Sequence, residues 1–129
     1  MLKKSITYVD YNGVERTEDF YFNMSKAERL GYAIGSDGGI DSFITKVVKE
    51  ENVKKLWDIW SDFILRCYGE KSSDGRRFIK SKELSEAFMQ TEAYNNLMME
   101  LMSSSGDANA KFVNAVVADV EKDPNKKAL

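Results

Sequence analysis

The first part of the chain alternates between apolar and polar residues in the manner of β-strands. Within residues 5–22, two runs rich in β-branched and aromatic residues flank Asn12-Gly13, which is a strong hairpin signal. A tight two-residue turn would place Ile6 opposite Asp19 and mix apolar and polar side chains on both faces. A three-residue loop, with Gly13 left-handed in a G1 bulge, shifts the register by one residue. We favour this bulged register because it gathers the apolar side chains on one face: Ile6, Tyr8, Val14, Phe20 and Phe22.

After Phe22 the apolar residues follow the three-to-four-residue period of helices. Ser25 and Glu28 have the spacing of a capping box, in which the two side chains satisfy free N–H groups of the first turn. We expect this first helix to be short, because Gly31 and then residues 35–39 interrupt it. Residues 35–39 (GSDGG) are glycine-rich and precede a helix, as phosphate-binding loops do. They lack the lysine and spacing of a P-loop, so we interpret them as a flexible connection.

Two apolar stripes with helical spacing follow this connection. The first stripe is narrow and comprises Ile40, Phe43, Ile44, Val47 and Val48. The second is wider, which predicts the central and most buried helix of the protein. It comprises Leu56, Trp57, Ile59, Trp60, Phe63, Ile64 and Cys67.

Residues 69–77 are polar and predict a loop, after which capping residues mark three more helices. Ser81 is placed to cap a helix that runs to Met89, and Thr91 to cap the next. After a serine-rich break, we expect Asp107 to cap a last helix that Pro124 ends. The apolar faces of the last two helices comprise Tyr94, Leu97, Met98, Leu101 and Met102, and then Phe112, Val113, Val116, Val117 and Val120.

These elements predict an α+β fold that is mostly α. We expect a single globular domain over residues 1–123, in which the hairpin of residues 5–22 packs on a bundle of about five or six helices within residues 24–123. Residues 124–129 are expected to form a flexible C-terminal tail. The length of 129 residues is enough for one modest core.

Composition narrows the function classes. The formal net charge of −2 counts against a nucleic-acid-binding protein, which usually shows a basic excess. The chain has one cysteine and no histidine, so it has no disulfide framework of its own and lacks the commonest general base and zinc ligand. No apolar run approaches the roughly 20 residues that a membrane helix needs. We therefore expect a soluble intracellular protein with no catalytic residues, no metal site and no cofactor.

One segment resembles a calcium loop. With Gly75 at position 6 of an EF-hand loop, Asp74 falls at position 5, where an oxygen ligand belongs. Phe78 then occupies position 9 and Ser81 position 12, where the bidentate glutamate should stand. Arg77 adds positive charge inside the loop. We therefore interpret the segment as a polar turn that enters a capped helix.

Two features suggest binding to another protein. A core role is the more frequent one for methionines on an amphipathic helix, and Met98 and Met102 fit the buried stripe. Met89 and Met99 are the candidates for exposed contacts, where methionine adapts to varied partners. The second feature is the hairpin, whose outer strand offers an edge for strand addition. Its charged residues are equally consistent with protection of that edge. The candidate partner-binding residues are Met89, Met99, Tyr94, Arg16 and Glu18.

The chain resembles a family of small proteins from the tail modules of long-tailed bacteriophages and prophages of Gram-positive bacteria, the tail assembly chaperones. Residues 6–23 (ITYVDYNGVERTEDFYFN) and residues 68–94, which begin YGEKS, carry the resemblance. A weaker match runs through residues 97–114. Together these segments cover well over half of the chain.

The resemblance implies a non-enzymatic assembly factor of the host bacterial cytoplasm that is absent from the mature virion. Such chaperones are thought to bind the tape measure protein, a long helical chain, and to keep it soluble until tube protein polymerises around it. Tail tube protein is a second candidate partner, and a homo-oligomer is a further candidate state. The family often makes a longer, frameshifted product, for which the codons of Lys126 and Lys127 are candidates.

Two other classes stay open at this point. A structural component of the virion, such as a head–tail connector or tail terminator, has a similar size. A nucleic-acid-binding module would use the only basic cluster, which comprises Arg76, Arg77, Lys80 and Lys82.

Overall fold

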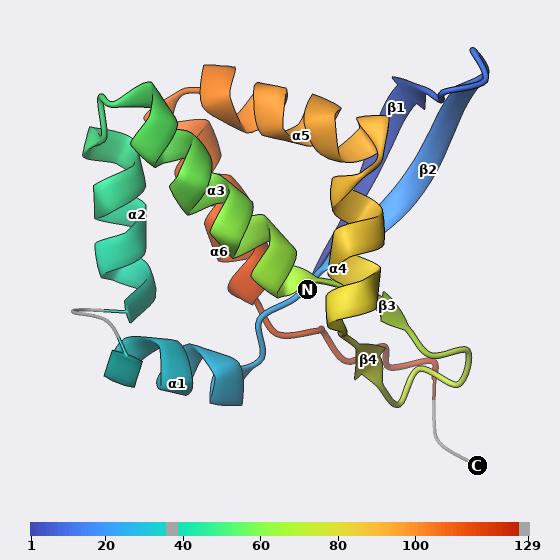
Figure 1. The fold of residues 1–129 in the computed structure, drawn as a ribbon. Helices are drawn as coiled ribbons and strands as arrows, with labels where there is room; N and C mark the ends of the chain where they lie inside the picture. Colours follow the sequence, from blue (N-terminus) through green and yellow to red (C-terminus); the bar gives the residue numbers. More distant parts are fainter. Residues whose placement is uncertain (36–38, 127–129) are drawn as a thin grey trace.

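The computed structural model describes residues 1–35 and 39–126 and shows an α+β fold in which helices predominate (Figure 1). The elements, in chain order, are β1 (Leu2–Val9), β2 (Glu15–Phe22), α1 (Lys26–Gly35), α2 (Gly39–Lys49), α3 (Val53–Cys67), β3 (Tyr68–Lys71), β4 (Phe78–Ile79), α4 (Lys82–Met89), α5 (Glu92–Ser103) and α6 (Gly106–Val117). The predicted fold class is therefore confirmed. Within the described ranges, no helix combines the length and the apolar character needed to cross a membrane.

The N-terminal hairpin adopts the bulged register. Ile6 faces Glu18 and Tyr8 faces Arg16 across an antiparallel ladder. The Asp10 N–H donates to the Val14 carbonyl at 2.8 Å. Gly13 has a φ of 80°, which is the left-handed conformation that the bulged loop requires. The predicted three-residue loop is thus confirmed.

The hairpin belongs to a larger antiparallel sheet of strand order β1-β2-β3-β4. Helix α3 passes into β3 without a loop, and the Asn23 N–H donates to the carbonyl of Cys67 at this junction, at 2.9 Å. Strand β3 pairs with β2 only at Tyr21 and Phe22. The predicted loop over residues 69–77 is confirmed for residues 72–77, but residues 69–71 form a strand, and the expectation that residues 24–123 are entirely helical was wrong. Short-range signals did not reveal that β2 provides a partner for β3.

Gly69 is required for the close packing of this small sheet. A Cβ atom at this position would lie 2.5 Å from the ring of Phe78 and 2.6 Å from the carbonyl oxygen of Ile79. No real side chain tolerates such distances. The absence of a side chain at Gly69 therefore lets β3 and β4 approach each other.

The first helix, α1, agrees with the prediction at its start but not at Gly31. The Ser25–Glu28 capping box is present, with the Glu28 N–H donating to the Ser25 hydroxyl at 3.1 Å and the Ser25 N–H donating to the Glu28 carboxylate at 3.0 Å. Helix α1 is short, as expected, and ends at Gly35, but Gly31 does not interrupt it. Residues 36–38, in the predicted connection and candidate phosphate loop, lie outside the described residues, as do residues 127–129 of the predicted tail.

The last helix begins and ends earlier than predicted. Ser105, not Asp107, caps α6, and its side chain accepts from the N–H of Ala108. The helix ends at Val117, so Val120 is 70% exposed and Pro124 lies well beyond the helix. The predicted caps of the two preceding helices, Ser81 and Thr91, are both confirmed.

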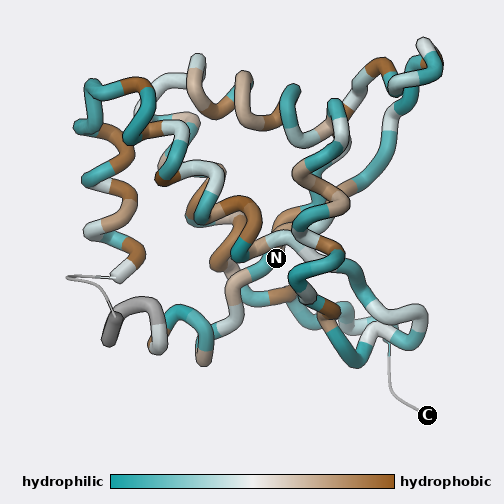
Figure 2. The backbone as a smooth tube through the Cα atoms, viewed as in Figure 1, coloured by the Kyte–Doolittle hydropathy of each residue, from teal (hydrophilic) through white to brown (hydrophobic). Residues whose placement is uncertain are grey.

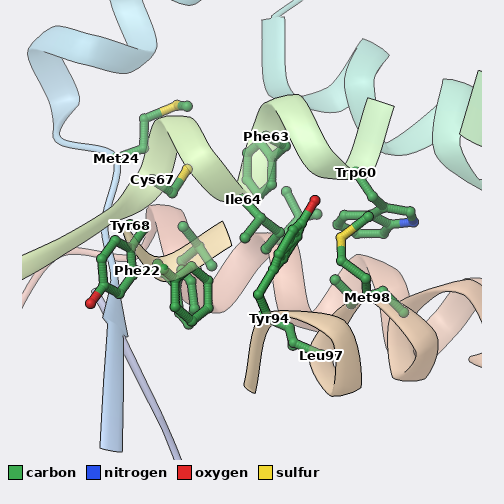
Figure 3. Close-up of a cluster of buried hydrophobic side chains, with 14 of the residues drawn as sticks. Phe22, Met24, Trp60, Phe63, Ile64, Cys67, Tyr68, Tyr94, Leu97 and Met98 are labelled. Atoms are coloured by element: carbon green, nitrogen blue, oxygen red, sulfur yellow. The ribbon is translucent and has the colours of Figure 1, made fainter. Parts of the chain in front are cut away.

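The core lies along α3, which crosses the middle of the molecule (Figure 2). Its side chains meet those of α5 and the sheet, as the close-up shows (Figure 3). The predicted central helix is confirmed. Its fully buried residues are Trp60, Phe63, Ile64 and Cys67, and they pack with Phe22, Tyr68, Leu97 and Met98.

Candidate protein-binding surfaces

The methionines of α4 and α5 divide between core and surface as predicted. Met98 is 0% exposed, and Met102 packs against the core from a half-buried position. Met89, the last residue of α4, is 41% exposed, and Met99, on α5, is 62% exposed. The structure places these two on different helices. Both are accessible apolar side chains that no internal packing requirement explains.

Tyr94, also predicted as a partner contact, lies in the core. It is 3% exposed, and its hydroxyl lies 2.7 Å from the Ser61 hydroxyl, which joins α5 to α3. Its backbone N–H donates to the capping oxygen of Thr91 at 3.1 Å. Tyr94 therefore holds α5 in place and is not accessible to a partner.

Arg16 and Glu18 are brought together on β2. The Arg16 Nε lies 2.6 Å from Asp10 Oδ2, and its Nη1 lies 3.7 Å from Glu18 Oε2. The hydrogen bond from Arg16, with backbone N–H groups of the turn, lowers the pKa of Asp10. The Tyr8 hydroxyl donates to Glu18, and this bond raises the pKa of Tyr8. Both predicted residues stay about half exposed, so a partner can reach them.

The tip of the hairpin is apolar and exposed. Val9, Tyr11 and Val14 are 54%, 74% and 51% exposed. The Tyr11 hydroxyl donates to Glu92 Oε1 at 2.9 Å, which ties the tip to the start of α5. The apolar pattern predicted Val14 on the face that docks against the helices, but the hairpin extends past them (Figure 1). We name these three residues the hairpin tip.

The two edges of the hairpin differ. Helix α5 lies along β1, where Asn96 Nδ2 donates to the Thr7 carbonyl at 3.1 Å and Lys4 pairs with Glu100 at 2.9 Å. In the part of the chain that the structure describes, the outer edge of β2 is paired only near its end, at Tyr21 and Phe22. The predicted exposed edge is therefore on β2, and the other edge of the hairpin is covered.

A groove lies where β2 and β3 diverge. It has a volume of about 790 Å³, with Glu18–Tyr21 on one side and Tyr68–Gly75 on the other. Sequence patterns did not predict this groove because they did not predict β3. Asp74-Gly75 was the available signal, since Asp-Gly between β-forming residues marks a hairpin.

The turn between β3 and β4 is stabilised by hydrogen bonds among its own residues. Asp74 Oδ1 accepts from the Ser72 hydroxyl at 2.7 Å and from the Arg76 N–H at 3.0 Å. These bonds lower the pKa of Asp74. Gly75 has a φ of 75°, so the segment is a glycine turn. Among the described residues, no group of three or more histidine, cysteine, aspartate or glutamate side chains is arranged to hold a metal ion.

The basic cluster near this turn is partly paired with acids. Lys80 Nζ lies 2.6 Å from Glu28 Oε2, and Lys82 Nζ lies 3.8 Å from Glu86 Oε1.

Cys67 is fully buried, and burial raises the pKa of its thiol to about 12. A thiol with this pKa stays protonated at neutral pH, so it is a poor nucleophile.

Comparison with known proteins identifies the family of the chain. No curated protein and no solved structure matches it. A family model described as phage tail assembly chaperone matches residues 1–127, which is nearly the whole chain. The match includes the hairpin, all six described helices and the β2–β3 groove. The chain therefore belongs to the phage tail assembly chaperone family.

Proposed function

We propose that this protein binds the tape measure protein and keeps it soluble during tail morphogenesis. The observation that carries the proposal is the family match over residues 1–127. The protein acts without catalysis, in the host bacterial cytoplasm, and leaves before the mature virion forms. Tail tube protein is a second candidate partner, because it must replace the chaperone on the tape measure protein.

Exposed apolar side chains support this function. A chaperone for a long helical client has to cover apolar stripes without a deep, specific pocket. Met89 and Met99 suit that task because the unbranched, polarizable side chain of methionine adapts to varied surfaces. The hairpin tip adds further exposed apolar surface, with Arg16 and Glu18 beside it. Such scattered contacts also favour release, because small interfaces bind weakly.

Co-expression with tape measure protein tests the proposal. The wild-type chain should increase the soluble fraction of the client. A Met89→Ser, Met99→Ser double variant should lose much of this effect while its fold is retained. Val53→Ser, Val120→Ser is a matched control, because these residues are 71% and 70% exposed and lie on other parts of the chain. The proposal fails if the wild-type chain leaves the solubility of the client unchanged.

The composition of purified particles distinguishes the chaperone from a virion component. Mass spectrometry of intact phage should detect tube protein and tape measure protein but not this chain. Stoichiometric amounts of the chain in the particle would instead identify it as a structural component, such as a connector or terminator.

A further inference from the structure

The alternation of hydrogen-bonded and non-hydrogen-bonded pairs in the hairpin shows which backbone groups of β2 point outward, that is, away from β1. In an antiparallel pair, residues alternate between those bonded to the partner strand and those directed away from it. The Asp10 N–H to Val14 carbonyl bond places the even-numbered residues in the bonded set. The bond from the Asn96 side chain to the Thr7 carbonyl agrees, because it shows that the backbone carbonyl of Thr7 points away from β2. Its cross-strand neighbour Thr17 therefore directs its own N–H and carbonyl away from β1.

The outward backbone groups at the C-terminal end of β2 are hydrogen-bonded to β3 or to the residue before it, whereas in the described chain those nearer the hairpin loop are not. The Asn23 N–H bonds the Cys67 carbonyl, and the next outward residue, Tyr21, faces Gly69. Beyond this pair the strands diverge into the groove. Within residues 1–35 and 39–126, nothing hydrogen-bonds to the backbone of the three remaining outward residues, Glu15, Thr17 and Asp19.

The unpaired segment is long enough for a short strand. Residues 15–19 span about 16 Å at about 3.3 Å per residue. Each of the three outward residues offers one donor and one acceptor, so an added strand finds a regular row of partners. No helix or strand lies along this flank of β2 in the described chain (Figure 1).

A second copy of the chain is one candidate occupant of this edge. An antiparallel pair of β2 edges with full overlap is centred on Thr17, which places Glu15 of each copy opposite Asp19 of the other. Like charges directly opposite each other destabilise a strand pair. The same register places Arg16 of each copy opposite Glu18 of the other, which is an attractive pair. The charges of β2 alone are therefore balanced between the two outcomes, and the charges of the groove decide the occupant.

The charges around the groove point to a basic occupant. Its acidic lining residues are Glu18, Asp19, Glu70 and Asp74, whereas its basic ones are Lys71 and Lys126. Glu15 adds a further carboxylate along the edge. Lys126 comes from the C-terminal segment, so the groove already borders one lysine from outside the sheet. Lys71 Nζ lies over the Tyr21 ring, 5.3 Å from its centroid. Three of these carboxylates already have partners: Glu18 bonds Arg16 and Tyr8, Asp19 accepts from the Ser5 hydroxyl, and Asp74 accepts from Ser72. Among the described residues, the Glu15 and Glu70 carboxylates have no such partner and are free to meet a cation.

We propose that the open edge of β2, from Glu15 to Asp19, binds an extended segment of a partner protein that carries lysine or arginine, by strand addition at the β2–β3 groove. This inference deepens the proposed function and rests on it for the identity of the partner, because the tape measure protein is the first candidate source of the segment. The bound segment forms backbone hydrogen bonds with β2, and its lysine or arginine side chains meet the carboxylates of the groove.

Thr17 and Thr7 provide a matched pair of test variants. They face each other across the hairpin, their hydroxyls lie 2.8 Å apart, and neither N–H belongs to the β1–β2 ladder. Thr17→Pro removes an outward N–H and blocks the open edge, whereas Thr7→Pro makes the same change on the edge beside α5. Both variants lose the same side-chain hydrogen bond. Circular dichroism of both variants checks that the fold survives.

The probe is a short synthetic peptide of alternating threonine and lysine, with a threonine–glutamate peptide as its control. We expect the lysine peptide to bind and the glutamate peptide not to bind. Thr17→Pro should weaken binding at least about tenfold, the effect of losing about one hydrogen bond, while Thr7→Pro leaves it unchanged. In the wild-type chain, NMR should show slower exchange of the Thr17 and Asp19 amides on binding. This measurement still decides the matter if a proline variant fails to fold.

Three results would overturn the inference. These are equal binding of both peptides, equal loss in both proline variants, and amide protection elsewhere than β2. A dimer of the free chain that Thr17→Pro dissociates would assign the edge to a second copy instead. The co-expression assay separates this inference from the proposed function. If Thr17→Pro still solubilises tape measure protein, the edge is not the client site, and the function stands without it.

Discussion

The rings of Phe88 and Tyr68 stack with their centroids 4.2 Å apart and their planes 9° apart. Tyr68 begins β3, and Phe88 is the buried residue near the end of α4. The same Phe88 ring lies 5.3 Å from Phe20 and 5.7 Å from Tyr94. This one side chain therefore joins the sheet to α4 and α5, which carry the exposed methionines.

Phe88→Ala should destabilise the protein strongly. The residue is 2% exposed, and removal of a buried phenylalanine costs about 3–5 kcal/mol through lost burial and the cavity left behind. The free energy of unfolding in urea measures this cost. Met89→Ala, at the next position, should cost within about 0.5 kcal/mol because its side chain is a surface one. Similar costs for the two variants would contradict the assignment of Phe88 to the core.

Gly69→Ala should disrupt the small sheet. Its Cβ would meet the Phe78 ring and the Ile79 carbonyl at distances that require one of them to move, which costs about 1–3 kcal/mol. Gly31→Ala is the matched control, because a Cβ there meets nothing within 4 Å and the residue lies inside α1. This control should gain about 0.5–1 kcal/mol from helix propensity. Thermal unfolding should therefore shift in opposite directions for the two variants.

The Glu28–Lys80 pair should contribute to stability above mildly acidic pH. Burial opposes ionisation of Glu28, but the Lys80 ammonium and the Ser25 N–H outweigh it, so the pKa of the carboxyl lies below its ordinary value of 4.5. A lowered pKa means that this contribution is present above pH 4.5 and is lost as the pH falls through the folded value. Because the pair is partly exposed, its value is at most about 1 kcal/mol. Glu28→Gln keeps the capping geometry and should flatten this part of the stability profile.

Cys67 should resist thiol reagents in the folded protein. Burial raises the pKa of its thiol from 9.0 to about 12, so little thiolate is present at neutral pH. A disulfide reagent should label it only as fast as the protein unfolds, and urea should restore rapid labelling. A raised pKa also implies stability that is present below pH 9 and lost as the pH rises towards 12. Cys67→Ala lacks this pH-dependent contribution, and rapid labelling of the native wild-type chain would show that the thiol is accessible.

The methionine prediction shows how far local pattern can reach. Helical spacing separates Met98 from Met99, because neighbouring residues on a helix point in directions about 100° apart. The spacing identifies the face of the helix but not what the face meets. Tyr94 shares the stripe of Met98, and only packing against Ser61 shows that it serves the core.

By itself, the sequence determined those features that depend on neighbouring residues. These include the register of the hairpin around Gly13, the capping of helices by Ser25, Ser81 and Thr91, and the burial of α3. Turns and caps form from a few adjacent residues, and apolar periodicity is local as well. The resemblance that residues 6–23 and 68–94 carry also indicated the family, and the family match over residues 1–127 confirms it.

Only the tertiary structure decided how β2 meets β3 and where they diverge. Tyr21 and Gly69 are distant in the chain, and a two-residue pairing leaves no periodic pattern in either segment. The pairing forms because packing places the last turn of α3 beside the end of β2, so it follows from long-range packing and not from local propensity. The covering of the β1 edge by α5 has the same origin. The open edge of β2 is thus a consequence of long-range packing.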